Sequence, residues 1–146
     1  MRATARWSTG LAAAWFGVIA CIAFISAPAA FATLLPADAG RLVGRLLAQE
    51  AYVGLGLALL LFFIERRRAR DAAEAGLGSV FSTEAVLLLG TIFCTVAGYF
   101  AIQPMMVAAR AGQGSWSFGA LHAVSSGFYG LKGLLVLALA WRFSRG

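Results

Sequence analysis

Residues 83–109 read TEAVLLLGTIFCTVAGYFAIQPMMVAA, and this stretch decides the fold of the chain. Glu84 is its only Asp, Glu, Lys or Arg. A transmembrane helix needs about 20 predominantly apolar residues, which this stretch supplies. Three other stretches have the same character. We therefore predict an all-α integral membrane protein, a bundle of four transmembrane helices over residues 7–31, 39–64, 83–109 and 118–142.

The composition excludes other classes of protein. Of the 146 residues, 61% are hydrophobic and 12% are charged, against about 45–50% and 25% in soluble domains. So few charges cannot cover the surface of a soluble domain. The net charge of +6 lies in short blocks between apolar stretches, which is typical of membrane topology and not of a nucleic-acid-binding face. We therefore expect the protein to lie in the lipid bilayer, and we expect no nucleic-acid partner.

The second predicted helix has the shortest apolar core. Residues 51–64 are too few to cross a bilayer, so we expect the helix to start near Ala39, with Asp38 as its N-cap. Residues 65–82 then form the longest loop, and residues 110–117 form a short link with two glycines. These connections leave no room for a second unit, so the whole chain, 1–146, is expected to form one domain.

The arginines predict the orientation. If the N-terminus is cytoplasmic, eight arginines lie on the inner side, against three on the outer side: Arg41, Arg45 and Arg110. Cytoplasmic segments carry the excess of Lys and Arg, so both termini are predicted to be cytoplasmic. Indole rings prefer the membrane interfaces, which suits Trp7, Trp116 and Trp141.

The first span has two alternative interpretations. Arg2 and Arg6 before an Ala-rich apolar run resemble a secretory signal peptide, and residues 18–21 (VIAC) have the shape of a lipoprotein cleavage box. The apolar run continues past Cys21 to Phe31, however, where a lipoprotein usually turns polar. We therefore expect the first helix to be retained.

Prolines and glycines suggest how the helices are arranged. Pro28 and Pro104 each lie late in an outward-running span, and proline tends to kink a helix. This pattern hints at a parallel repeat of two helical hairpins.

Small residues let helices approach closely within the bundle, among them Gly17, Gly54 and Gly130. The same glycine-rich faces could hold a second copy of the chain or a partner in a membrane complex.

Two ionisable residues lie deep in the predicted spans. At about 1.5 Å per residue, Lys132 lies roughly 15 Å from the inner boundary at Arg142, near mid-membrane. Glu50 comes about 7 Å further out, within reach of a long lysine side chain. Pairing would offset two buried charges, so we expect a Glu50–Lys132 pair. Either the pair only satisfies itself, or Lys132 snorkels toward the membrane surface, or the two residues serve as an ion or proton relay.

His122 is the single histidine of the chain. Its spacing places it on one helical stripe with Ser125 and Tyr129, and Gln103 should lie at similar depth on the third span. These residues, with Glu50 and Lys132, would line a polar cavity or form interhelical hydrogen bonds. A zinc site needs more ligands than one histidine. His122 could instead be an axial ligand to haem or, with Cys and Met residues, a copper ligand.

Motifs for a reaction are missing from the sequence. It contains no phosphate-binding Gly-rich loop, nucleophile elbow, HExxH or CxxC. We therefore expect a non-enzymatic membrane protein with a polar cavity or a small-solute or ion pathway, and no cofactor. The alternative is a haem- or copper-binding membrane redox protein that uses His122 as a ligand.

Several short segments resemble a known family. Residues 34–36 (LLP), 39–46 (AGRLVGRL), 104–110 and 121–126 (LHAVSS) are similar to a bacterial membrane family of unknown function related to human transmembrane protein 205. The resemblance covers residues 10–142 and implies a four-helix domain in the bacterial inner membrane. At the superfamily level it extends to copper-resistance membrane proteins and a haem-biosynthetic membrane oxidase, which would make His122 the ligand.

Overall fold

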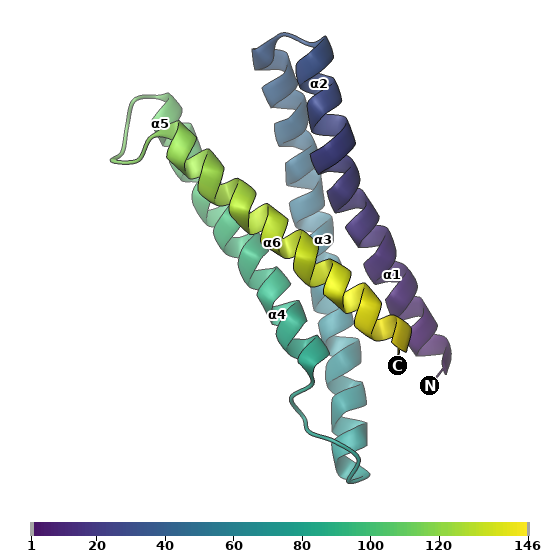
Figure 1. The fold of residues 1–146 in the computed structure, drawn as a ribbon. Coiled ribbons are helices and arrows are strands. Elements are labelled where there is room, and N and C mark those ends of the chain that lie inside the picture. The colour runs from purple at the N-terminus through teal and green to yellow at the C-terminus, as the bar shows by residue number, and fades with distance from the viewer. Residues whose placement is uncertain (1, 146) are drawn as a thin grey trace.

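The computed structural model describes residues 2–145, which contain helices and no strand. Four long helical segments follow one another along the chain (Figure 1): α1 (Arg2–Cys21), η1 (Ile22–Ser26) and α2 (Ala27–Thr33); α3 (Pro36–Glu74); α4 (Thr83–Thr95), η2 (Val96–Ala101) and α5 (Ile102–Arg110); and α6 (Phe118–Arg145). All four are long and apolar enough to cross a membrane, as predicted.

The helices form two hairpins that are joined at one end and diverge at the other (Figure 1). Both chain ends lie at the joined end, which we call the terminal end; the α2–α3 and α5–α6 links lie at the far end. α6 packs against both α1 and α4, and α4 also packs against α3. Both α6 and α4 therefore hold the second hairpin to the first.

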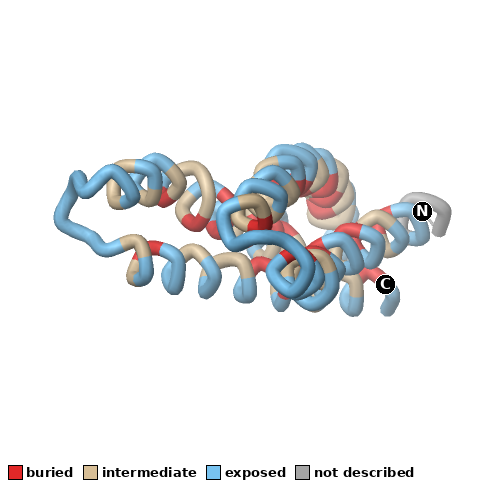
Figure 2. Tube along the Cα trace, turned by 90° about the horizontal axis from the view of Figure 1, so that it is seen from above, coloured by how far each residue is buried: buried red, intermediate tan, exposed pale blue. Residues whose placement is uncertain are grey.

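The apolar core lies in the terminal half. One cluster contains Ala12, Leu61, Leu88, Leu139 and Phe143, from four different helices. A second cluster contains Trp15, Ile19, Ala58 and Val136. Figure 2 shows that the buried residues lie on the facing sides of the helices, whereas the outward sides are exposed.

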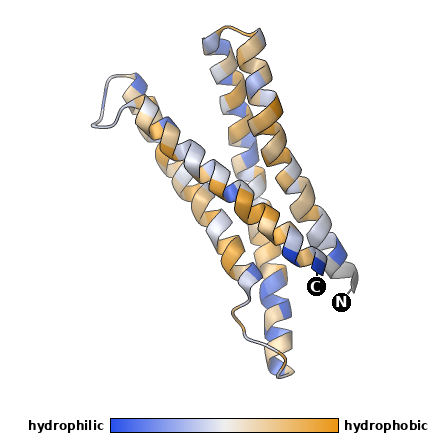
Figure 3. Cartoon of the chain, in the orientation of Figure 1, coloured by the Kyte–Doolittle hydropathy of each residue, from blue (hydrophilic) through white to orange (hydrophobic). Residues whose placement is uncertain are grey.

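The outward faces suit lipid and not water. Large apolar side chains cover them, such as Phe24, Phe63 and Leu134, which are 80%, 63% and 65% exposed. Soluble monomers rarely expose apolar patches of such extent. Figure 3 shows hydrophobic residues along all four helices, with hydrophilic residues gathered at the lower end of α3 and at the C-terminal end of α6.

α3 departs from its predicted boundaries at both ends. It begins at Pro36, in the first helical position, and Asp38 lies in the first turn beside Arg41, so the prediction of Asp38 as N-cap was wrong. Proline is preorganised for that first position. The predicted 65–82 loop is also too long, because α3 continues to Glu74. The residues beyond Ile64 are largely Ala, Arg and Glu, which are strong helix formers.

The prolines of the first and third membrane helices each follow a π-helical segment. η1 ends two residues before Pro28, and η2 ends three residues before Pro104. At the end of η1, the Ala27 N–H bonds to Ile22 O, five residues back. Proline has no N–H for the ordinary helical bond, and π-bulges often accompany such interruptions and functional sites. The predicted disturbance at both prolines thus takes the form of a π-helical segment.

Candidate functional site

Glu50 of α3 and Lys132 of α6 form an ion pair inside the bundle. Lys132 Nζ donates to Glu50 Oε2 at 2.5 Å, and the two residues are 3% and 4% exposed, lysine first. The structure therefore brings together the two charges that were expected to pair from their depth. Charged side chains in membrane spans are costly, so such a pair is the first candidate for a functional site.

Trp15 of α1 completes this pair. Its Nε1–H donates to Glu50 Oε1 at 3.0 Å, so each carboxylate oxygen has a donor. Trp15 is 2% exposed, whereas Trp7 and Trp141 near helix ends and Trp116 in the α5–α6 link are 74%, 59% and 56% exposed. Sequence reasoning missed Trp15. Its mid-span position could have indicated this contact, because a buried indole N–H usually has a hydrogen-bond partner.

Gly54 makes room for the Trp15–Glu50 bond. A Cβ at this position would lie 2.8 Å from Glu50 Oε1 and 2.9 Å from Trp15 Nε1. Gly54 was expected to allow general helix packing, but its neighbours are the two atoms of this bond. By contrast, a Cβ on Gly17 or on Gly130 would meet nothing within 4 Å, so the chain itself does not fill these glycine faces.

Tyr129 lies one turn from Lys132 on α6. Its hydroxyl donates to the Ile19 carbonyl oxygen of α1 at 3.3 Å. Its ring also faces the ammonium group, with Lys132 Nζ 5.0 Å from the ring centroid, a distance at which a cation–π attraction acts. Tyr129 therefore ties α6 to α1 and helps to surround the lysine.

Ser125 continues the same stripe toward the far end. Its hydroxyl donates to the Gly98 carbonyl oxygen at 2.7 Å, inside η2. Hydroxyl side chains often satisfy backbone groups that an interrupted membrane helix leaves free. Ser125, Tyr129 and Lys132 thus lie on one stripe of α6 and reach three different helical segments. For Ser125 and Tyr129, the structure shows interhelical hydrogen bonds.

His122 is exposed and is not enclosed with the ion pair. Its ring stacks on Phe118, with centroids 5.9 Å apart and planes 11° apart. It lies in the first turns of α6, about 15 Å along the helix from Lys132, and the two hairpins diverge toward this end of α6 (Figure 1). Gln103 is half-buried on α5. Within residues 2–145 there is no group of three or more His, Cys, Asp and Glu side chains that could hold a metal ion.

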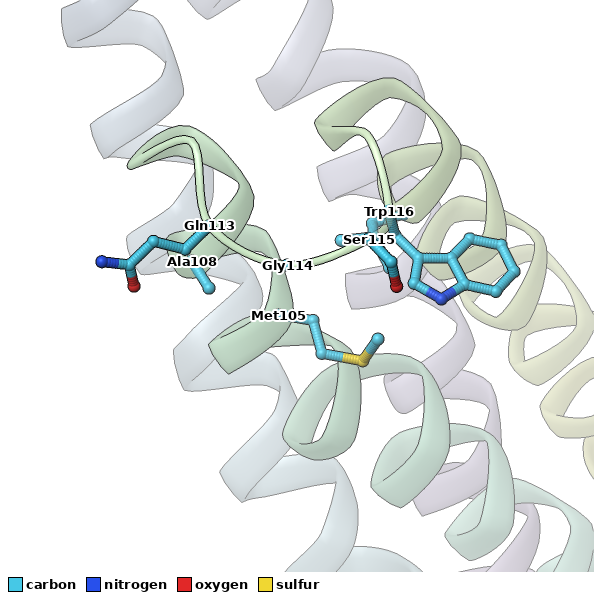
Figure 4. A pocket seen from close by; sticks show the side chains of 7 residues that line it. Met105, Ala108, Gln113, Gly114, Ser115 and Trp116 are labelled. Atoms are coloured by element: carbon cyan, nitrogen blue, oxygen red, sulfur yellow. The ribbon is translucent and has the colours of Figure 1, made fainter.

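A small hollow lies at the far end, beside the α5–α6 link. Its volume is about 170 Å³. Figure 4 shows the loop with Gly114 passing above the Met105 side chain. The lining is mainly apolar and comes from Met105, Ala108, Gln113, Gly114, Ser115, Trp116 and Leu121. None of the expected polar residues lines this hollow.

The fold and the buried pair together define a polytopic α-helical membrane protein in which opposite charges join two hairpins. Residues 10–115 match the profile of the domain of unknown function DUF4149, and the chain belongs to this family. The match includes Glu50 and Trp15 but ends before α6, which carries Lys132. No curated protein and no solved structure shows a significant match.

Proposed function

We propose that this protein is a non-enzymatic protein of a bacterial inner membrane, with both termini cytoplasmic, that passes a proton or small cation through a site at Glu50. The distribution of arginines supports this orientation, since the predicted inner side carries eight of them. The paired π-segments and prolines support a parallel repeat of two hairpins. The resemblance to the transmembrane protein 205 family and to copper-resistance membrane proteins remains part of this proposal.

The observation that carries the proposal is the buried Glu50–Lys132 pair. A buried ion pair contributes little net stability, and apolar residues of similar volume often serve as well or better. In a membrane span this argument is stronger, because ionisable residues there mark ion and proton pathways. The pair is therefore better explained by a role that needs charge than by packing alone.

The geometry suggests how such a site works. Both Glu50 oxygens are already bonded, so an arriving proton or cation must compete with Lys132 or with Trp15 for the carboxylate. Release of Lys132 would free the middle of α6. Because α6 also carries Tyr129 and Ser125, its movement would reach α1 and η2 through their hydrogen bonds.

Flux measurements in proteoliposomes test this proposal. Wild type should pass protons, Na⁺ or K⁺ faster than empty liposomes, and Glu50→Gln and Lys132→Met should reduce this flux to background. Glu84→Gln is the matched control, because Glu84 pairs with Arg142 at 2.7 Å at the edge of the bundle. Its flux should equal that of wild type.

A double variant separates pathway from scaffold. Removing one partner of a buried pair typically costs about 3–5 kcal/mol, so each single variant can lose flux through misfolding alone. Glu50→Leu with Lys132→Met leaves no unpaired charge and should be more stable than either single variant, although the buried Trp15 N–H loses its acceptor at a cost of about 1–3 kcal/mol; flux should not return. Wild-type flux in this double variant, or a wild-type protein that passes none of the three ions, would overturn the proposal.

The alternative proposal is a haem- or copper-binding protein with His122 as a ligand. Its support is the exposed imidazole, which is open to a ligand at the far end. Protein from cells supplied with copper and a haem precursor should then show a Soret band or stoichiometric copper, and His122→Ala should lose it. A colourless, metal-free preparation would refute this alternative.

A further inference from the structure

A second hollow, of about 270 Å³, lies beside the C-terminal end of α6. It is lined by Glu84, Trp141, Arg142 and Arg145. Arg142 Nε donates to Glu84 Oε1 at 2.7 Å, so these two charges neutralise each other. The Arg145 guanidinium lies 4.3 Å from the Trp141 ring centroid. Among residues 2–145, no carboxylate forms an ion pair with Arg145. Of the described residues that line the hollow, Arg145 therefore presents a guanidinium with no ion-pair partner among them.

An exposed apolar stripe of α6 leads from this hollow toward the middle of the membrane helix. Leu131, Leu134 and Trp141 are 47%, 65% and 59% exposed, and the small, half-buried Ala138 lies between the last two. Their spacing places them on one helix face, which Arg145 continues. From Leu131 to Trp141 the stripe measures about 15 Å, half of a hydrocarbon core of about 30 Å.

We propose that this surface binds an anionic phospholipid, with the phosphate on Arg145 and an acyl chain along the stripe. A basic side chain beside an indole suits the headgroup region, where both residue types are favoured. The adjoining apolar stripe, one leaflet long, favours a lipid over free phosphate. This site lies at the edge of the bundle and does not depend on ion passage at Glu50.

Native mass spectrometry of the full chain, equilibrated with vesicles of phosphatidylglycerol or phosphatidylcholine, tests the headgroup. Wild type should retain phosphatidylglycerol in preference. Arg145→Gln should lower this retention roughly fivefold, the contribution typical of one arginine near an anionic surface. Arg110→Gln is the matched control, because Arg110 lies 4.5 Å from the Phe118 ring centroid in a similar arrangement at the far end. Because Arg110 also lies at the end of a membrane span, Arg110→Gln should lower retention less than Arg145→Gln does, and the difference between them measures the site.

Two further variants test the other parts of the site. Glu84→Gln releases Arg142 and should raise phosphatidylglycerol retention. Leu134→Ser interrupts the apolar stripe and should lower it. Circular dichroism should show wild-type helicity in every variant, since all the changed side chains lie at the surface or edge.

Three outcomes would overturn the proposal. The first is equal retention of the two lipids by wild type. The second is equal retention by Arg145→Gln and Arg110→Gln. The third is displacement of phosphatidylglycerol by inorganic phosphate with no effect of Leu134→Ser, which would assign the hollow to free phosphate.

Discussion

Gly54 and Gly56 lie two residues apart on α3, and they differ in what surrounds them. A Cβ on Gly54 would lie 2.8 Å from Glu50 Oε1 and 2.9 Å from Trp15 Nε1, whereas a Cβ on Gly56 would meet nothing within 4 Å. Alanine at either position should gain about 1 kcal/mol in helix propensity. Only Gly54→Ala must also push apart the donor and acceptor of the buried site.

The loss of stability in Gly54→Ala can be estimated from two costs, overpacking and loss of the Trp15–Glu50 hydrogen bond. Because the gain in helix propensity is common to both variants, it cancels when they are compared. If Glu50 and Trp15 only shift, overpacking should make Gly54→Ala less stable than Gly56→Ala by about 1–3 kcal/mol. If the hydrogen bond to the carboxylate is lost as well, the difference should rise to roughly 3–6 kcal/mol.

Equilibrium unfolding in mixed micelles of a nonionic detergent and dodecyl sulfate, followed by circular dichroism, measures this difference. The penalty of Gly54→Ala should shrink in a Trp15→Phe background, because the smaller ring lacks the nitrogen that the new methyl group would strike. Equal unfolding free energies for Gly54→Ala and Gly56→Ala would show that the close approach at Gly54 is absent from the folded protein.

Three other substitutions, and one control, should be measured in the same unfolding assay. Gly98→Ala should be strongly destabilising, because its Cβ would lie 2.4 Å from Phe128 Cβ, an atom that no side-chain rotation can move; Gly127→Ala, which meets nothing within 4 Å, should not be. Ser125→Ala should cost about 0.6 kcal/mol, the average for hydrogen bonds between membrane helices. His122→Ala should stay within about 0.5 kcal/mol of wild type, because the side chain is exposed; a larger loss would place His122 in an enclosed site.

The four membrane helices could be predicted because length and apolar content alone decide them. The ends of α3 could not, since a span criterion stops at Ile64 whereas the helix continues for as long as its residues favour helix. Hydropathy also does not report the π-helical segments. These depend on how Pro28 and Pro104 change backbone hydrogen bonding, and on which neighbouring groups form hydrogen bonds with the backbone there.

The candidate site was predictable only in part, for a geometric reason. Depth along a helix follows from residue number, and depth alone brings Glu50 within reach of the long Lys132 side chain. Which faces meet depends on helix rotation and on where the hairpins diverge, and neither follows from one sequence. For this reason the Trp15 contact was missed and His122, expected to face the interior, is exposed.

The polar stripe of α6 therefore divides into two parts with different roles. Ser125 and Tyr129 donate to backbone carbonyls, whereas Lys132 on the same stripe forms an ion pair with Glu50. Each oxygen of Glu50 has one donor and the residue is 4% exposed, so an arriving cation must reach a buried carboxylate that is already paired. Trp15→Phe removes one donor and leaves the charges paired.

If Glu50 is the site through which an ion passes, Trp15→Phe should raise flux in proteoliposomes above wild type, because one carboxylate oxygen is then open. Trp7→Phe, in which the replaced indole is 74% exposed at a helix end, is the matched control and should conduct as wild type does. If the pair only holds the helices together, Trp15→Phe should weaken the fold and leave flux at background. A lower free energy of unfolding without higher flux would therefore favour a scaffold, whereas higher flux in a variant that remains folded would favour a gated pathway.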